Sequence, residues 1–428
     1  MKEIKKSNIS NNIIAFMILL VPFNYSIISS INGITYYLIH FLPFIALIYL
    51  GLKYIIDISK TKRISRIEAL YFIFFVIMNM FILHNNGELI SKNYYSFALF
   101  EGYLLLPLFM INNKNMIKAI FKVIPFFILE HVIGVLFELL FNELYIDFFI
   151  NRFLGGSGYT RYYLLMSWIK QGYLAGFTTN YSSCAMSLGI GVIFYLIKLL
   201  KNRNWKNIIK LIIVLVCLLL TAKRAVLFFS LISFIIVYII SEKKINKKVK
   251  RIITITITFI IVLLLLGVFS TSIPELGNIF TRINAIFEDD TFGNRMRLYT
   301  AAVDYWKIHP LIGNGWKTFM LYYNQFLPSN AMYSYDVHNV YLQLLCENGI
   351  IGMLVILIPM LTLFIKNFKV IKNTKMSSMS YFSVIFQLYF FLYCITGNPL
   401  YDCQCYVPYL ISIGVTFYMI KKGGDDFE

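Results

Sequence analysis

Charged residues are scarce in this chain. They make up 14% of its 428 residues, whereas hydrophobic residues make up 59% and aromatic residues 17%. A typical soluble domain carries about 25% charged residues, so the composition excludes an ordinary soluble protein. It predicts an all-α polytopic membrane protein.

Acidic residues and cysteines are also few. There are 21 acidic against 39 basic residues, which gives a net charge of +18. The 6 cysteines lie mainly in apolar segments, where they are most simply buried small hydrophobic residues. A bridge between Cys403 and Cys405 would span a single residue and be strained.

Two further features are absent. No small-residue cleavage site follows the basic start and apolar run of Met1–Tyr25, so we interpret this stretch as a retained first helix and not as a cleaved signal peptide. No repeat with a period of roughly 20 to 50 residues is present.

Long apolar segments fill most of the chain. A membrane-spanning helix needs about 20 mostly apolar residues, and the sequence predicts about twelve such helices. The shortest two almost touch, which makes the boundary between the seventh and eighth uncertain. The predicted segments are Asn12–Ser30, Ile34–Ile56, Ile67–Leu83, Tyr94–Ile111, Met116–Leu140, Tyr173–Leu200, Ile208–Ala222, Ala225–Ile240, Ile252–Phe269, His338–Ile365, Tyr381–Gly397 and Tyr406–Ile420.

The basic residues are distributed unevenly about these segments. If the N-terminus is cytoplasmic, 28 of the 39 Lys and Arg residues fall on the cytoplasmic side. This distribution follows the positive-inside rule. It predicts cytoplasmic N- and C-termini in the inner membrane, and it explains the basic charge without a nucleic-acid partner.

Two outer loops are long. Phe141 to Gly172 joins predicted helices five and six, and Ser270 to Val337 joins helices nine and ten. Long loops in compact proteins usually have a function. We therefore expect three parts: residues 1–269 with nine helices and an outer loop at 141–172; a partly helical extracytoplasmic loop at 270–337; and residues 338–428 with three helices and a short cytoplasmic tail. Within the longer loop, Asn294 to His309 is predicted to be an amphipathic helix ended by Pro310.

The stretch Asp336 to Leu354 follows the longer loop directly. Asp336 is a good N-cap, so a helix is predicted to begin near Val337 with His338 in its first turn. A helix N-terminus could hold an anion beside this histidine. The alternative is that His338 only anchors the helix at the membrane interface. The spacing also predicts one helix face, with glycines that let another helix approach, formed by His338, Leu342, Leu345, Gly349 and Gly352.

Ionisable residues also fall at membrane depth. Arg224 lies between two apolar runs, where a basic residue costs at least ~2.5 kcal/mol and is therefore expected to be paired or functional. The alternative is that Lys223 and Arg224 extend to the headgroups. Glu130 and His131 could relay protons, but neighbours point about 100° apart on a helix, which favours an ordinary buried pair.

Four segments together resemble the O-antigen ligase and repeat-unit polymerase family of Wzy/WaaL-like glycosyltransferases. The likeness runs roughly from Gly172 to Ile365. Its elements are His338-Asn339 leading to Glu347-x-Gly349-x-x-Gly352; Arg295-x-x-x-Tyr299 leading to His309-Pro310-x-x-Gly313-x-Gly315; Thr221-Ala-Lys-Arg224; and Gly176 to Asn180.

The sequence departs from the family pattern at three positions. Tyr299 stands where the family usually has Trp, Lys223 where it often has Ser, and Lys317 at a common glycine position. These departures concern the geometry of substrate binding.

The resemblance implies transfer of a glycan from an undecaprenyl-pyrophosphate carrier to an acceptor hydroxyl on the outer face of the cytoplasmic membrane. Arg224 and Arg295 would neutralise the pyrophosphate, and His338 would deprotonate the acceptor as a neutral base. The substrate-binding residues would be Asn180, Arg161, Tyr299, Gly313, Gly315 and Asn339. No metal or other cofactor is expected.

We favour a polymerase of lipid-linked repeat units for O-antigen or capsular polysaccharide. A ligase acting on lipid A-core in lipopolysaccharide, and a lipid-linked oligosaccharide flippase, are the alternatives. The expected partners are the undecaprenyl-pyrophosphate-linked glycan, membrane lipid, a separate flippase and a chain-length regulator, with no nucleic acid. The flippase alternative does not require the long outer loop.

Overall fold

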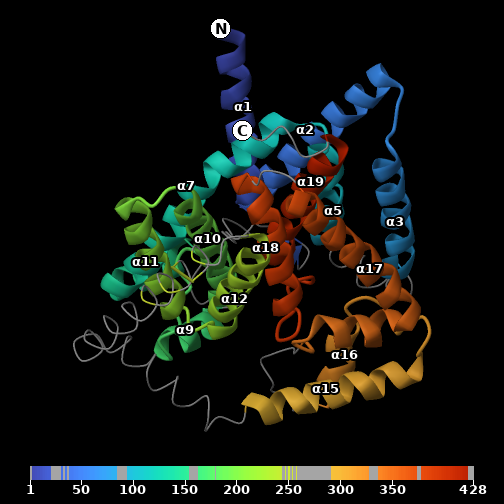
Figure 1. The fold of residues 1–428 in the computed structure, drawn as a ribbon. Coiled ribbons are helices and arrows are strands. Elements are labelled where there is room, and N and C mark those ends of the chain that lie inside the picture. Colours follow the sequence, from blue (N-terminus) through green and yellow to red (C-terminus); the bar gives the residue numbers. More distant parts are fainter. Residues whose placement is uncertain are drawn as a thin grey trace.

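A computed structural model gives the fold, and helices dominate it (Figure 1). The structure describes residues 2–20, 30–31, 34–35, 38–83, 94–153, 162–178, 180–242, 246, 249–250, 253, 257, 291–326, 336–373 and 377–422. The strands in this part of the chain are β1 (Ser30–Ile31) and β2 (Ile34–Thr35), which pair antiparallel. The all-α prediction is confirmed apart from this two-residue ribbon.

The first half of the chain contributes helices to the main bundle and a short π-helix. They are α1 (Lys2–Leu19), α2 (Leu38–Thr61), α3 (Arg66–Leu83), α5 (Tyr94–Leu104), α6 (Leu106–Met110), α7 (Lys114–Leu140), α8 (Asn142–Leu144), η1 (Tyr145–Phe153), α9 (Tyr162–Lys170) and α10 (Tyr181–Lys201).

The second half adds helices that pack beside them. They are α11 (Trp205–Leu220), α12 (Arg224–Ser241), α15 (Thr291–Ile308), α16 (Phe319–Asn324), α17 (Val340–Asn373), α18 (Ser378–Tyr393) and α19 (Cys403–Lys422).

Six of the described helices are long and apolar enough to cross a membrane: those within α2, α3, α7, α10, α12 and α17. Three shorter apolar helices lie at Ile9–Leu19, Ser378–Tyr393 and Cys405–Lys421. Most of the ninth predicted segment, Ile252–Phe269, lies outside the described residues. The membrane-protein class is thus confirmed, while the number twelve and the place of the long loop stay predictions.

Several predicted helix boundaries agree closely with the structure, and some predicted helices are interrupted. The expected Ile67–Leu83 and Met116–Leu140 correspond to α3 and α7. The expected Tyr94–Ile111 is divided at Leu105 into α5 and α6, with a proline in the first turn of α6. Proline fits there because that position needs no intrahelical N–H bond.

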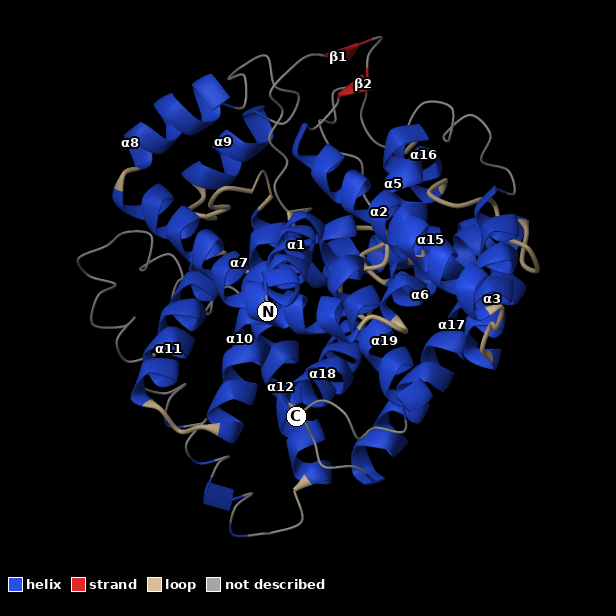
Figure 2. Cartoon of the chain, turned by 90° about the horizontal axis from the view of Figure 1, so that it is seen from above, coloured by secondary structure: helices blue, strands red, loops and turns tan. Residues whose placement is uncertain are grey.

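α10 forms the centre of the bundle. In its most apolar window 83% of residues are buried, against 22% for α2 and α3, so α10 is enclosed by protein while α2 and α3 are peripheral. Close neighbours of α10 are α7, α11, α12 and α18. Figure 2 places α11 and α3 at opposite margins, with α10, α12, α18 and α19 between them.

Buried polar side chains join the C-terminal helices. Asn367 on α17 donates to Ser383 on α18 over 3.0 Å, and Gln387 on α18 donates to Thr416 on α19 over 2.9 Å. Such bonds fix neighbouring helices where lipid offers no hydrogen-bonding partner. By contrast, the fully buried His131 places Nδ1 2.9 Å from the Phe127 carbonyl of its own helix, as expected for an ordinary buried residue.

α15 and α16 lie at the end of the bundle opposite the two marked termini (Figure 1). The helix predicted over Asn294 to His309 is confirmed as α15. Its apolar face packs on the start of α17 in a cluster of Leu298, Ala302, Phe319, Val337 and Cys346. This packing places α15 beside the residues that precede α17.

Candidate functional site

His338 lies in a turn immediately before α17. Its φ of 56° is in the left-handed region, and α17 begins at Val340. The predicted start near Val337 with Asp336 as cap is therefore wrong. Asn339 serves as the cap, because its Oδ1 accepts a hydrogen bond from Leu342 N over 3.1 Å.

Bonds to α18 and within α17 fix this turn. Val340 N donates to the Cys394 carbonyl over 2.9 Å, and the Tyr341 hydroxyl donates to the Phe391 carbonyl over 2.9 Å. Asp336 accepts from Gln343 Nε2 over 3.2 Å. The turn that carries His338 is thus held against the end of α18, while the His338 side chain stays exposed.

Two cationic residues affect the pKa of His338. Desolvation by neighbouring protein is the largest cause that lowers its pKa to about 4 from 6.5, although the side chain still reaches solvent. The positive charges of Lys223 and Arg295 lower the pKa further, and the negative charge of Asp336 opposes them. The lowered pKa favours the neutral imidazole at neutral pH, while the role of His338 as a base stays a prediction.

Lys223 lies in the tight turn that joins α11 to α12. Ala222 in this turn has a φ of 59°, and Arg224 N donates to its carbonyl over 3.2 Å. The ammonium of Lys223 stands 4.8 Å from the centre of the Tyr181 ring, within the range of a cation–π contact. Arg224, the first residue of α12, is partly buried and makes an interaction of its own.

Tyr181 begins α10 and belongs to an aromatic group. It stacks on Tyr173 at 4.8 Å and meets the edge of Trp168 at 4.8 Å. Asn180, predicted to bind substrate, caps α10 by accepting from Ser182 N over 2.8 Å. Asn180 and Lys223 therefore both adjoin Tyr181.

A buried carboxylate supports the loop before α10. Glu138 of α7 accepts hydrogen bonds from Ala175 N over 2.8 Å and from Gly176 N over 2.7 Å. Gly176 has a φ of 57°, and a Cβ there would lie 3.0 Å from the backbone of Val135. The glycine that resembles the family's Gly-to-Asn turn thus serves close packing on α7.

Arg295 and Tyr299 lie on α15, one turn apart. Both are partly buried, and Tyr299 packs against the cluster beneath α15. α15 therefore brings Arg295 toward His338 and Lys223, whereas Tyr299 contributes to holding the helix in place.

The Gly313 to Gly315 turn packs backbone to backbone against a break in α17. Gly315 N donates to the Glu347 carbonyl over 2.7 Å. Asn314 Nδ2 donates to the Cys346 carbonyl over 2.9 Å. Gly349 at the break has φ 66° and ψ −176°. A contact of Gly313 or Gly315 with substrate stays a prediction, since their visible role is this packing.

The predicted glycine face of α17 is wrong for Gly349 and correct for Gly352. Gly349 interrupts the helix and meets the Leu311 carbonyl, so it does not continue a helical face. Gly352 does allow a helix to approach, because a Cβ there would lie 2.9 Å from the Phe81 ring of α3. Lys317 has a φ of 61°, which explains why glycine suits that position.

Glu347 and Lys223 were not predicted to be site residues. Glu347 is fully buried and accepts from Lys317 N over 2.9 Å, Phe319 N over 3.3 Å and Gln343 Nε2 over 3.1 Å. Gln343 bonds Asp336 in turn, so this carboxylate connects the loop to the turn of His338. The position of Glu347 in the Glu-x-Gly motif could have indicated its role. No motif indicated the role of Lys223, because its contact partner Tyr181 is distant in sequence.

Some predicted residues lie outside the described part of the chain. Arg161, predicted to bind substrate, is one of them, and the acidic run Glu288 to Asp290, where a divalent-cation site could be sought, lies there too. Among the described residues, no group of three or more His, Cys, Asp or Glu is arranged to hold a metal ion. The structure therefore brings together His338, Asn339, Arg295 and Lys223 with Tyr181, beside the first turn of α12.

Comparison with known proteins gives a match for part of the chain. No curated protein matches the chain. Residues 209–357 match a family model described as O-antigen ligase, and this range extends from α11 to the first part of α17, including Lys223, Arg224, Arg295 and His338. This part of the chain is therefore similar to the O-antigen ligase family, in agreement with the resemblance of its sequence motifs.

Proposed function

We propose that this protein polymerises undecaprenyl-pyrophosphate-linked oligosaccharide repeat units into O-antigen or capsular polysaccharide. The family domain suggests glycosyl transfer in O-antigen assembly, and the donor, the polymerase activity and the residue roles are our proposal. The observation that carries it is that His338 is exposed in the turn before α17 and that the charges of Lys223 and Arg295 act on its imidazole.

The donor carries its own leaving group, so catalysis requires two things of the protein. One is stabilisation of negative charge on the departing pyrophosphate, and the other is removal of a proton from the acceptor hydroxyl. Arg295 and Arg224 would form forked bonds with phosphate oxygens, and Lys223 would add a point charge. His338, as general base, would take the acceptor proton.

Donor binding would itself activate the base. In the free protein desolvation holds the pKa of His338 low, and the charges of Lys223 and Arg295 lower it further, which makes it a weak base. A bound pyrophosphate would offset these charges and raise the proton affinity of the imidazole. His338 would then become a stronger base only when the donor is in place.

The location of the site agrees with the proposed topology. α15, which carries Arg295, lies at the end of the bundle away from both marked termini (Figure 1), and the residues that precede α17 pack against it. With cytoplasmic termini, this end would face the outer side, where lipid-linked units are assembled in our proposal. The lipid tail would lie between helices.

A ligase is the second candidate, favoured by the description of the matching family model. Deletion of the gene separates the two. Loss of polymer with accumulation of single lipid-linked repeat units supports a polymerase. Persistence of lipid-linked polymer, with lipid A-core left uncapped, would instead identify a ligase.

The proposed transfer does not use a metal ion. Arginine and lysine would neutralise the charge that Mg²⁺ or Mn²⁺ neutralises in metal-dependent transferases. We expect purified protein to turn over after exhaustive EDTA treatment, and Asp289→Asn with Asp290→Asn to retain near-normal activity. Activity that stops on chelation and returns with added Mg²⁺ would contradict this part of the proposal.

A further inference from the structure

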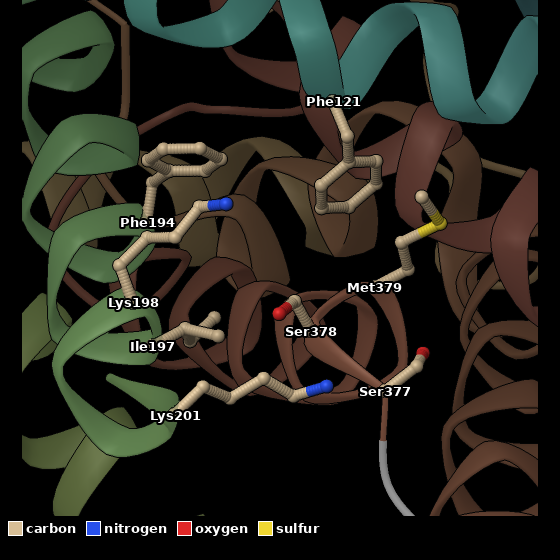
Figure 3. Close-up of a pocket in the computed structure, with 8 residues that line it drawn as sticks. All are labelled: Phe121, Phe194, Ile197, Lys198, Lys201, Ser377, Ser378 and Met379. Atoms are coloured by element: carbon tan, nitrogen blue, oxygen red, sulfur yellow. The ribbon is translucent and has the colours of Figure 1, made fainter. Parts of the chain in front are cut away.

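A cavity lies at the other end of the bundle, away from His338. Its volume is about 180 Å³, and α7, α10 and the start of α18 line it. Figure 3 shows its walls: Phe121 and Phe194 at the top of the view, Ser377 and Ser378 below them, and the side chains of Lys198 and Lys201 reaching in from α10. The cavity is separate from the site already described, which adjoins the first turn of α10 and the end of α18.

The cavity combines two positive charges with hydroxyl groups. Lys198 and Lys201 both extend from the last turn of α10 into the space between α10 and α18 (Figure 3). None of the described lining residues carries a carboxylate. Ser377, which caps α18 by accepting from Ser380 N over 3.1 Å, also lines the cavity, so the positive end of that helix lies at the cavity. This lining is suited to an anion.

A simpler interpretation of the lysines is that they only complement the dipole of α10. Two observations indicate that the lysines also contribute to the cavity. The lysines are exposed, but they also line a partly open cavity that they share with α7 and the start of α18. The ammonium of Lys198 also lies 5.3 Å from the centre of the Phe194 ring, which directs it along the cavity wall.

The apolar wall indicates what kind of anion would fit. Phe121 and Phe194 are buried and form one side of the cavity. The membrane-spanning stretch of α10 ends at Lys201, and the apolar helix α18 begins at Ser378. Both ends therefore lie at one membrane surface, at the level where lipid phosphates meet acyl chains.

We propose that this cavity binds the phosphate of an anionic phospholipid, with Lys198 and Lys201 contacting the phosphate and Phe121 and Phe194 contacting the start of the acyl chains. A zwitterionic lipid binds less well, because its cationic headgroup is repelled by the two lysines. The site is independent of the proposed glycosyl transfer.

The test measures lipid retention by the purified full chain. Native mass spectrometry would count phosphatidylglycerol and phosphatidylcholine molecules bound over a titration. We expect preference for phosphatidylglycerol in the wild-type protein, and roughly 10-fold weaker binding in Lys198→Gln with Lys201→Gln, the scale of a lost charge-assisted hydrogen bond.

The matched control is Lys206→Gln with Lys210→Gln on α11. It removes the same charge from two exposed lysines near the same end of the bundle, and its binding should equal that of the wild type. Equal losses in both variants would overturn the proposal in favour of general surface attraction. Displacement of the lipid by millimolar inorganic phosphate would overturn the lipid assignment and identify free phosphate as the ligand.

Discussion

Gly313 and Gly349 meet where the loop after α15 crosses the break in α17. A Cβ on Gly313 would lie 2.3 Å from the Glu347 carbonyl oxygen, and a Cβ on Gly349 would lie 2.3 Å from the Leu311 carbonyl oxygen. Both residues have positive φ, 79° and 66°. This contact, together with the carboxylate of Glu347, joins the loop to the helix that follows His338.

Gly349→Ala should therefore disrupt the junction. The new methyl group would strike backbone that cannot move aside, in a conformation that disfavours L side chains, so we expect a loss of at least about 2 kcal/mol of unfolding free energy. Thermal unfolding in detergent measures it. Gly51→Ala in α2 is the control, because a Cβ there would meet only the Phe109 ring at 3.3 Å; equal stability of the two variants would refute the role of this junction.

The helices were largely predictable because each depends on local sequence. Long apolar runs gave α3 and α7 closely, and the spacing of apolar residues gave α15 and its buried face. The prediction of a continuous helix face through Gly349 failed, because tertiary packing determines the backbone there. At the break, the backbone of Gly349 lies directly against the Leu311 carbonyl. That contact joins residues that are far apart in sequence.

The site was predictable only in part, because local motifs identify some of its residues and tertiary contacts determine the others. His338 and Arg295 were recognised from their motifs, but the cap was not, since Asp336 and Asn339 are both suitable by residue type. The choice follows from the bond between Val340 N and the Cys394 carbonyl, which fixes where α17 begins. Lys223 was considered only as a headgroup anchor, because its closeness to Tyr181 and to the charge environment of His338 is a tertiary property.

His338→Asn is the sharpest test of the proposed base. Asparagine tolerates the left-handed φ of this turn better than most residues, so the backbone should be retained. The amide cannot accept the acceptor proton, and we expect transfer to fall by roughly 100-fold to 10,000-fold. Polymer ladders and the amount of protein in the membrane would be measured together; ladders like those of the wild type would return His338 to an anchoring role.

Arg→Lys changes test phosphate binding. Lysine keeps the charge but loses the forked geometry, so Arg224→Lys or Arg295→Lys should lower activity by roughly 10-fold to 150-fold, equivalent to ~1.5–3 kcal/mol. Arg297→Lys is the matched control, because Arg297 lies on the same helix as Arg295 and is exposed. Full activity of both test variants would indicate that the arginines provide only general electrostatic attraction.

The pH dependence of transfer tests whether the donor activates His338. In the free protein the pKa of His338 is lowered to about 4 from 6.5, so the acid limb of kcat/KM, which reports the free enzyme, should follow a pKa well below 6.5. The acid limb of kcat, which reports the donor complex, should lie at higher pH. The same depressed pKa means that the unfolded chain binds more protons between these two values, so the contribution of His338 to stability is lost as pH falls through that window.

Two variants test the direction in which the acid limb of kcat/KM should move. Lys223→Gln and Arg295→Gln each remove a charge that disfavours the imidazolium, so each should move the acid limb of kcat/KM to higher pH. Arg297→Gln should leave the limb in place unless distant charges contribute equally. If the limbs of kcat and kcat/KM coincide in the wild-type protein, and neither charge removal moves them, the donor does not control the base and the proposed coupling between pyrophosphate and His338 is wrong.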